Sequence, residues 1–149
     1  MKKKIKKIPP VKSVMTPFPY WIDLNSPIKD AERMMAEHHI HHLPVKENGT
    51  VVGMIADRDL RLTLNPTIGA GGGNKKVTIK DICTFHPYIV DLKEPLDEVT
   101  EHMAKNRVGT ALVLRNGRLA GIFSSLDACR FLSQFLKDQF ADPEDKLIA

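Results

Sequence analysis

Hydrophobic and polar residues follow the same order twice along this chain. In the first half, apolar residues at helical spacing come after Ser26-Pro27, which predicts a helix with Ser26 as its N-cap. Two β-rich runs, 43–47 and 51–55, then flank Asn48-Gly49, and this predicts a hairpin because both turn residues tolerate positive φ. A second helix is expected at about 57–64. The positions at helical spacing are Ile28, Ala31, Met34, Met35 and His38.

The second half of the chain repeats this pattern. Shifting the sequence by 68 residues aligns 12–61 with 80–129 without a gap, and fourteen of the fifty positions are identical. A hairpin is expected around Asn116-Gly117, followed by a helix at about 125–138. Two copies of this length predict a pseudo-symmetric pair and not a solenoid. The expected fold class is α/β (α+β), with two pseudo-twofold related βαββα repeats. The first helix of this half is predicted from Leu96, Val99, His102 and Met103.

The composition of the chain indicates where these repeats begin and end. The net charge of +4 comes from five lysines before residue 8, and the remaining chain has 17 basic against 18 acidic side chains. We therefore expect a basic tail and no nucleic-acid face. The glycines before Lys75 lack the residue order of a P-loop and indicate a linker. The expected segments are a tail 1–11, repeat 12–66, linker 67–78, repeat 79–138 and tail 139–149.

The repeated stretches resemble the CBS domain, in the paired arrangement called a Bateman module. The resemblance rests on Val14-Met15-Thr16-Pro17, on His41-His42-Leu43-Pro44-Val45, on the run 53–60, and on 121–127 in the second copy. It covers residues 12 to about 136. It implies a small stand-alone bacterial CBS pair that binds an adenine nucleotide or S-adenosylmethionine in clefts between its repeats. Such a protein is expected to be a cytoplasmic regulator and not an enzyme, with no required cofactor.

The resemblance also implies which residues bind the ligand. In one cleft, Asp127 would hold the ribose and Ser124 a hydroxyl or phosphate, since an Asp in the first turn of a helix can accept two hydroxyl hydrogen bonds. An adenine ring needs an apolar slot. Ile122, Thr16, Tyr20 and Ile40 would line the slot of this cleft, which carries Thr110 where relatives often have a basic residue.

The pseudo-symmetric cleft departs from the family pattern. Asp59 would hold the ribose there, but Ala56 stands where the other copy has Ser124, and His42 stands where relatives often have a residue that contacts phosphate. We expect the two clefts to differ in affinity for the ligand, but the sequence does not indicate which of them binds it more tightly. The base would lie against Met54, Thr84, Tyr88 and Val108.

Several alternatives remain open from the sequence. Ser124 and Asp127 also fit a capping box, and Asp59 fits simple stabilisation of a helix dipole. The histidines at 38, 39, 41 and 42 suggest a metal site, but neighbouring side chains on a strand point to opposite faces, so no metal site is expected.

Partners can be named only by class. The alternative to ligand binding is a pure interaction module with empty clefts, and in either case the downstream protein is unknown. No run of apolar residues is long enough to span a membrane. Two distant cysteines, Cys83 and Cys129, are expected to be reduced thiols. Phe131, Leu132, Phe135 and Leu136 would seal either a homodimer face or the core beneath the last helix.

Overall fold

The computed structural model describes residues 7–17, 19–64 and 77–141, which form two compact units. The first, here called the continuous unit, is Phe18–Pro87. The second, here called the composite unit, joins Met1–Pro17 to Tyr88–Ala149. The beginning of the chain therefore belongs with the second repeat, although the first repeat follows it directly in sequence.

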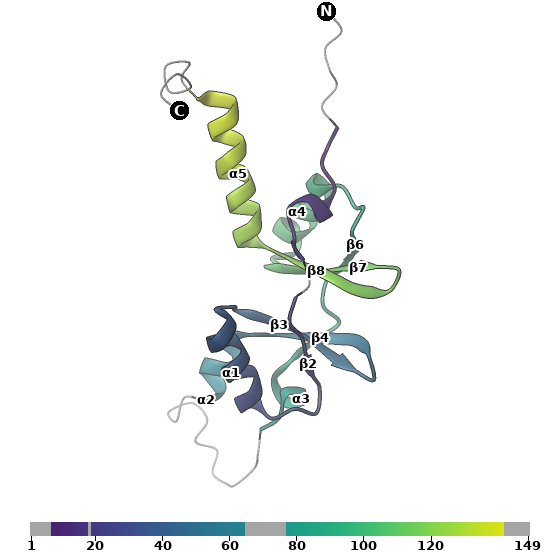
Figure 1. The fold of residues 1–149 in the computed structure, drawn as a ribbon, viewed down its shortest axis with the longest axis vertical. Coiled ribbons are helices and arrows are strands. Elements are labelled where there is room, and N and C mark those ends of the chain that lie inside the picture. The colour runs from purple at the N-terminus through teal and green to yellow at the C-terminus, as the bar shows by residue number, and fades with distance from the viewer. Residues whose placement is uncertain (1–6, 18, 65–76, 142–149) are drawn as a thin grey trace, which may run out of the picture. The chain divides into compact units, whose positions relative to one another are not determined.

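The continuous unit is a four-stranded sheet with helices packed on one face (Figure 1). Its sheet order is β2-β3-β4-β5, in which β2 runs parallel to β3 and the other neighbours are antiparallel. The core contains Ile28, Ala31 and Met35 on one helix, packed against Leu43, Val45 and Ile55 of the sheet. The elements are β2 (Ile22–Asp23), α1 (Ile28–His38), β3 (His42–Glu47), β4 (Thr50–Ala56), α2 (Asp57–Leu64), α3 (Ile79–Ile82) and β5 (Thr84–Phe85).

The composite unit has the same architecture. Its sheet order is β1-β8-β7-β6, and Phe123, with no exposed surface, lies in its core. Its last helix, α5, is twice as long as its counterpart α2 and projects away from the sheet of its own unit (Figure 1). The elements are η1 (Val11–Ser13), β1 (Thr16–Pro17), β6 (Ile89–Asp91), α4 (Leu96–Asn106), β7 (Thr110–Arg115), β8 (Arg118–Ser124) and α5 (Ser125–Phe140).

The structure confirms the mixed α/β class and the two βαββα repeats. The two predicted hairpins join β3 to β4 and β7 to β8. At the first turn, Asn48 and Gly49 have φ of 49° and 79°, and at the second, Asn116 and Gly117 have φ of 49° and 74°. These angles are the ones that favour Asn-Gly in tight hairpins.

Each repeat gives a short edge strand to the sheet of the other repeat. β1 precedes the first repeat but pairs with β8, and β5 precedes the second repeat but pairs with β4. Glycines permit both approaches, because a Cβ built on Gly121 would lie 2.8 Å from the Thr16 carbonyl oxygen and one on Gly53 would lie 2.8 Å from that of Thr84. This exchange places a threonine of one repeat beside the last strand of the other.

The predicted N-cap of the first helix is wrong by one residue. The N-cap is Pro27, which has no side-chain cap. Ser26 is held in the preceding turn instead, because its N–H donates to the Asp23 carbonyl oxygen and its carbonyl oxygen accepts from the Ile79 N–H. The last helix also continues past the predicted residue 138 to Phe140.

The predicted basic tail, linker and C-terminal tail lie only partly within the residues that the structure describes. The lysines before residue 7, the linker up to residue 76 and the tail after residue 141 lie outside them. Cys83 and Cys129 are free thiols. None of the helices in 7–17, 19–64 and 77–141 is long and apolar enough to cross a bilayer.

Candidate functional site

The predicted ligand residues of each unit lie on one face of its sheet. In β8, Gly121 and Phe123 are buried and alternate with Ile122 and Ser124. Successive side chains of a strand point to opposite faces, so Ile122 and Ser124 share the face that is turned away from the helix-packed core. Directly paired residues share a face as well, and the pairs here are Thr16 with Ile122 and Thr110 with Ser124.

Asp127 lies at the end of this face, in the first turn of α5, and is 8% exposed. Its Oδ2 accepts hydrogen bonds from the Ser124 N–H at 2.8 Å and from Ser124 Oγ at 2.9 Å, while Ser124 Oγ accepts the Asp127 N–H at 3.3 Å. The capping-box interpretation of this pair is therefore confirmed. Asp127 Oδ1 is 3.4 Å from Nη1 of Arg130, an ion pair that was not predicted although its i,i+3 spacing is favourable.

The continuous unit repeats this arrangement with one group fewer. Met54 and Ala56 share a face of β4, and they pair with Thr84 and His42 respectively. Asp59 Oδ2 accepts the Ala56 N–H at 3.1 Å, but no hydroxyl is present at position 56 to donate a second hydrogen bond. The carboxylate of Asp59 therefore accepts one hydrogen bond at the start of its helix, whereas that of Asp127 accepts two.

The remaining predicted residues are divided between the units. Tyr20 and Ile40, which the sequence assigned to the ligand of Asp127, belong to the continuous unit, while Tyr88 and Val108, which it assigned to the ligand of Asp59, belong to the composite unit. Tyr20 stacks on His38, with 3.7 Å between ring centroids, and Tyr88 stacks on His102 at 4.0 Å. Each tyrosine thus has one face of its ring covered by a histidine of its own unit.

A cluster of charged side chains that was not predicted from the sequence surrounds the start of α2. His41 Nδ1 lies 2.9 Å and Arg61 Nη2 lies 2.7 Å from the same Asp57 Oδ2. Burial raises the pKa of Asp57, but the hydrogen bonds and charges of His41 and Arg61 outweigh burial, so its pKa lies below the usual value. The Asp57 to Arg61 spacing of i,i+4 was the signal available in the sequence.

Desolvation by burial lowers the pKa of the neighbouring His42. Asp57 and Asp59 oppose this shift, whereas His41 and Arg58 add to it. Three of the four histidines that suggested a metal site thus have separate surroundings, since His38 stacks on Tyr20, His41 contacts Asp57 and His42 lies opposite Ala56 in the ladder. Among the described residues, no group of three or more metal-binding side chains is placed to hold an ion.

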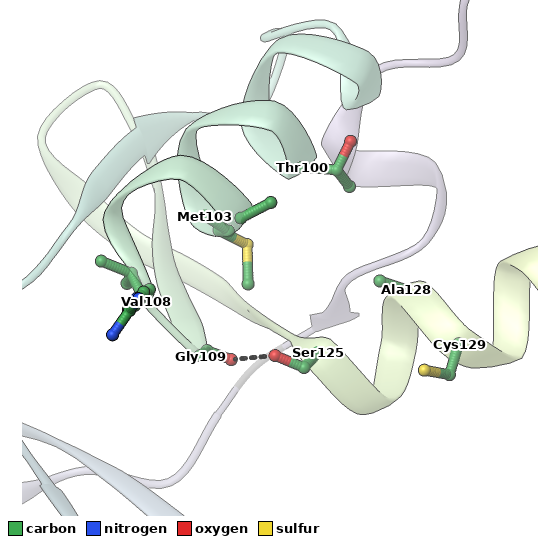
Figure 2. Close-up of a pocket in the computed structure, with 9 residues that line it drawn as sticks. Thr100, Met103, Val108, Gly109, Ser125, Ala128 and Cys129 are labelled. Atoms are coloured by element: carbon green, nitrogen blue, oxygen red, sulfur yellow. Dashed lines mark hydrogen bonds between the residues drawn. The ribbon is translucent and has the colours of Figure 1, made fainter.

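A pocket of about 410 Å³ lies between α4 and α5, on the helix side of the composite unit (Figure 2). Of the predicted site residues, only Val108 lines it. Ser125 donates from Oγ to the Gly109 carbonyl oxygen at 3.2 Å and closes one end of the pocket. A second pocket of about 360 Å³ shares Thr100 and Ala128 with it and extends to Ile8 and Leu132. Because the two pockets share these two lining residues, they are referred to together as the α4–α5 groove.

Comparison with known proteins identifies relatives of both repeats. A family model described as CBS domain matches residues 11–65 and 79–134. The chain is 33% identical over 122 residues to L-aspartate semialdehyde sulfurtransferase of Methanocaldococcus jannaschii, covering 80% of this chain and 22% of that protein. It is 31% identical over 130 residues to inosine-5'-monophosphate dehydrogenase of Thermoplasma acidophilum, covering 87% of this chain and 24% of that one. The chain therefore spans less than a quarter of either enzyme.

A solved structure is similar to this chain over almost all of its own length. It is the CBS domain pair of protein MJ0100 in complex with 5′-methylthioadenosine and S-adenosyl-L-methionine. The TM-score is 0.74 and the sequence identity is 29%, and the match covers 87% of this chain and 99% of that one.

Proposed function

The chain belongs to the CBS domain family, and we propose that it is a regulatory module that binds an adenosyl ligand without converting it. The observation that carries this proposal is the 29% identity, across nearly the full length, to a CBS domain pair in complex with 5′-methylthioadenosine and S-adenosyl-L-methionine. The proposed sites are the two sheet faces described above. They are named here by their acidic residues, as the Asp127 site and the Asp59 site.

The chemistry of these faces supports the proposal. A carboxylate has about four lone-pair positions, so an Asp that already accepts hydrogen bonds in a helix cap can also accept ribose hydroxyls. Asp127 leaves Oδ1 with one contact, to Arg130 at 3.4 Å, and Asp59 is bonded only through Oδ2. Beside each carboxylate the sheet provides an apolar residue and a threonine, which suits a nucleoside with one polar and one apolar part.

A thermal-shift series tests the proposal directly. We expect AMP, ATP, 5′-methylthioadenosine or S-adenosylmethionine at 100 times its dissociation constant to stabilise the chain by about 2.7 kcal/mol, because a ligand that binds only the folded state shifts unfolding by mass action. Uridine monophosphate is the control for nonspecific binding of a nucleotide. Absence of a shift with all four adenosyl compounds would contradict the proposal.

One observation favours a second candidate, an interaction module with no ligand. The capping box already gives Ser124 and Asp127 a structural role, so their presence does not require a nucleotide. The same thermal-shift series distinguishes the candidates, since this one predicts no stabilisation by any of the compounds.

We further propose that the α4–α5 groove and the exposed face of α5 pair with a second copy of the chain. Leu132, Phe135 and Leu136 are 53%, 45% and 45% exposed, so the interpretation of these residues as core is wrong, and only Phe131 packs against the core. The helix extends beyond the sheet that would cover it. Contiguous exposed apolar surface marks interaction sites, and the interfaces of homodimers are the more apolar kind.

Replacing Phe135 with glutamate is expected to weaken self-association about 30-fold or more. A buried aromatic residue at the centre of an interface typically contributes at least ~2 kcal/mol, and a charge there would add a desolvation cost. Sedimentation velocity over a concentration series measures the effect, with Lys137→Glu as the control on the same helix. A wild-type chain that stays monomeric at high concentration would overturn the proposed dimer.

A further inference from the structure

The two tyrosines that are expected to lie against the base of the ligand are each stacked on a histidine. The ring centroids are 3.7 Å apart in the pair Tyr20–His38 and 4.0 Å apart in the pair Tyr88–His102, and the ring planes differ by 12° and 13°. Aromatic pairs in proteins more often have centroids about 4.5–7 Å apart. In both units, therefore, the imidazole lies flat against one face of the phenol ring.

The tyrosines stand at equivalent positions of the two repeats, but the histidines do not. The shift of 68 residues that aligns the repeats places the two tyrosines on one another. The same shift aligns His38 with Asn106, and it aligns His102 with Met34. A copied repeat would carry its histidine at the same position, so the two stacks do not follow from the duplication alone.

Each helix reaches its tyrosine from a different turn. His38 is the last residue of α1, whereas His102 lies four residues before the end of α4. Residues four apart are neighbours on one side of a helix, so both positions can cover a ring at the same place. The position without a histidine has another role in each unit, since Met34 packs against the core and Asn106 donates from its side chain to the His102 carbonyl oxygen at 2.9 Å.

Burial of the histidines does not account for the stacks. Both imidazoles are exposed, and in the described part of the chain neither forms a hydrogen bond or an ion pair. Tyr20 is 48% exposed and Tyr88 is partly exposed, although a histidine covers one face of each ring. Each ring therefore keeps surface that a ligand can contact. A nucleobase stacks well on an aromatic ring, and a side chain that is ordered beforehand loses less conformational entropy on binding.

We propose that His38 and His102 are positioning residues that hold the rings of Tyr20 and Tyr88 for stacking on the adenine base of the ligand. This inference rests on the proposed function and adds two residues to it. The histidines act through the tyrosines, because the imidazole occupies one face of the phenol ring and the base takes the other. Without the imidazole, the tyrosine must be ordered when the ligand binds, and affinity falls.

Calorimetric titration with AMP and with 5′-methylthioadenosine, which share the adenine base, tests the inference. His38→Ala and His102→Ala should each weaken binding roughly twofold to tenfold, the effect of ordering one side chain on binding. His38→Phe and His102→Phe keep a planar ring beside the tyrosine and should bind about as tightly as the wild type. Glu37→Ala and Glu101→Ala are the matched controls, because each removes an exposed neighbour of one histidine. An alanine variant that keeps wild-type affinity for both probes would show that its histidine has no positioning role.

Moving one histidine along its helix gives a sharper test. The double variant His102→Met with Asn106→His gives α4 the arrangement of α1, in which the histidine lies one turn later. It should recover the affinity that His102→Met alone loses. Proton NMR shows whether the stack has formed, because an imidazole against the ring shifts the tyrosine ring resonances upfield. The chain has two tyrosines, so these resonances can be assigned with single variants.

Two results would overturn this inference and leave the proposed function intact. One is wild-type affinity in both alanine variants. The other is a double variant whose tyrosine resonances are shifted as in the wild type but whose affinity is not recovered. Failure of both probes to bind the wild type would overturn the proposed function and this inference together.

Discussion

Replacing Asp127 with alanine should weaken binding of 5′-methylthioadenosine roughly 10- to 150-fold. Hydrogen bonds to a charged group contribute about 1.5–3 kcal/mol, and each 1.4 kcal/mol is a factor of ten in affinity. Asp127 is nearly buried, and its Oδ1 has only the 3.4 Å contact with Arg130, so no other described side chain replaces it as an acceptor at this point of the sheet face. Isothermal titration calorimetry measures the change.

The capping box makes a control necessary, because Asp127→Ala also removes a helix cap. Ser124→Ala removes the hydroxyl that donates to Asp127 and accepts its N–H, but keeps the carboxylate. Both variants should lose ~1 kcal/mol of unfolding free energy, as is usual for a lost cap. Asp127→Ala should lose much more affinity than Ser124→Ala, because only Asp127→Ala removes the carboxylate. If the two variants lose affinity equally, the carboxylate affects binding by holding the start of the helix and not by contacting the ligand.

Replacing Gly121 with alanine is expected to destabilise the composite unit by about 1–3 kcal/mol, the usual cost of inserting a methyl group into a packed contact. The new Cβ would lie 2.8 Å from the Thr16 carbonyl oxygen and would overlap the Met15 side chain. β1 has only two residues, so this strand is the element that must move. Thr16 would move with it, and ligand affinity at the Asp127 site should fall as well. Urea unfolding followed by circular dichroism measures the stability.

Gly109→Ala is the matched control for this substitution. Its Cβ would lie 3.7 Å from Ser125 Oγ, which is an ordinary contact distance. Neither glycine has a positive φ, so the two substitutions differ in crowding and not in backbone strain. We expect Gly109→Ala to change stability by less than about 0.5 kcal/mol. Equal stability of the two variants would show that the close approach of β1 to Gly121 does not require a glycine there.

The main elements of the fold could be predicted because their signals are local. Helical spacing of apolar residues and the Asn-Gly turns fix α1, α4 and both hairpins without reference to the rest of the chain. The exchange of β1 and β5 had no such signal. Each of these strands has two residues, which is too short for an alternating pattern, and their partners are determined by distant parts of the sequence.

The site was predictable in its residue types but not in its bonding. The sequence could place Ser124 and Asp127 together, yet both a cap and a ligand site fit their spacing, and only the geometry shows that the serine hydroxyl is engaged in the cap. It also directed attention to the histidines as possible metal ligands. Their actual contacts involve Asp57 and Tyr20, which lie on other elements, and spacing alone does not reveal such neighbours.

The pairing of β1 with β8 has a consequence for the order in which the chain is made. Every strand of the continuous unit is translated before Pro87, so its ladder can close while the nascent chain is still growing. β1 leaves the ribosome first but has no partner until β8 emerges, roughly 5–20 s later at ordinary rates of elongation. During that interval an unpaired edge is open to wrong partners. A two-residue strand that ends in Pro17, which has no N–H to donate, offers little for such a partner to bind.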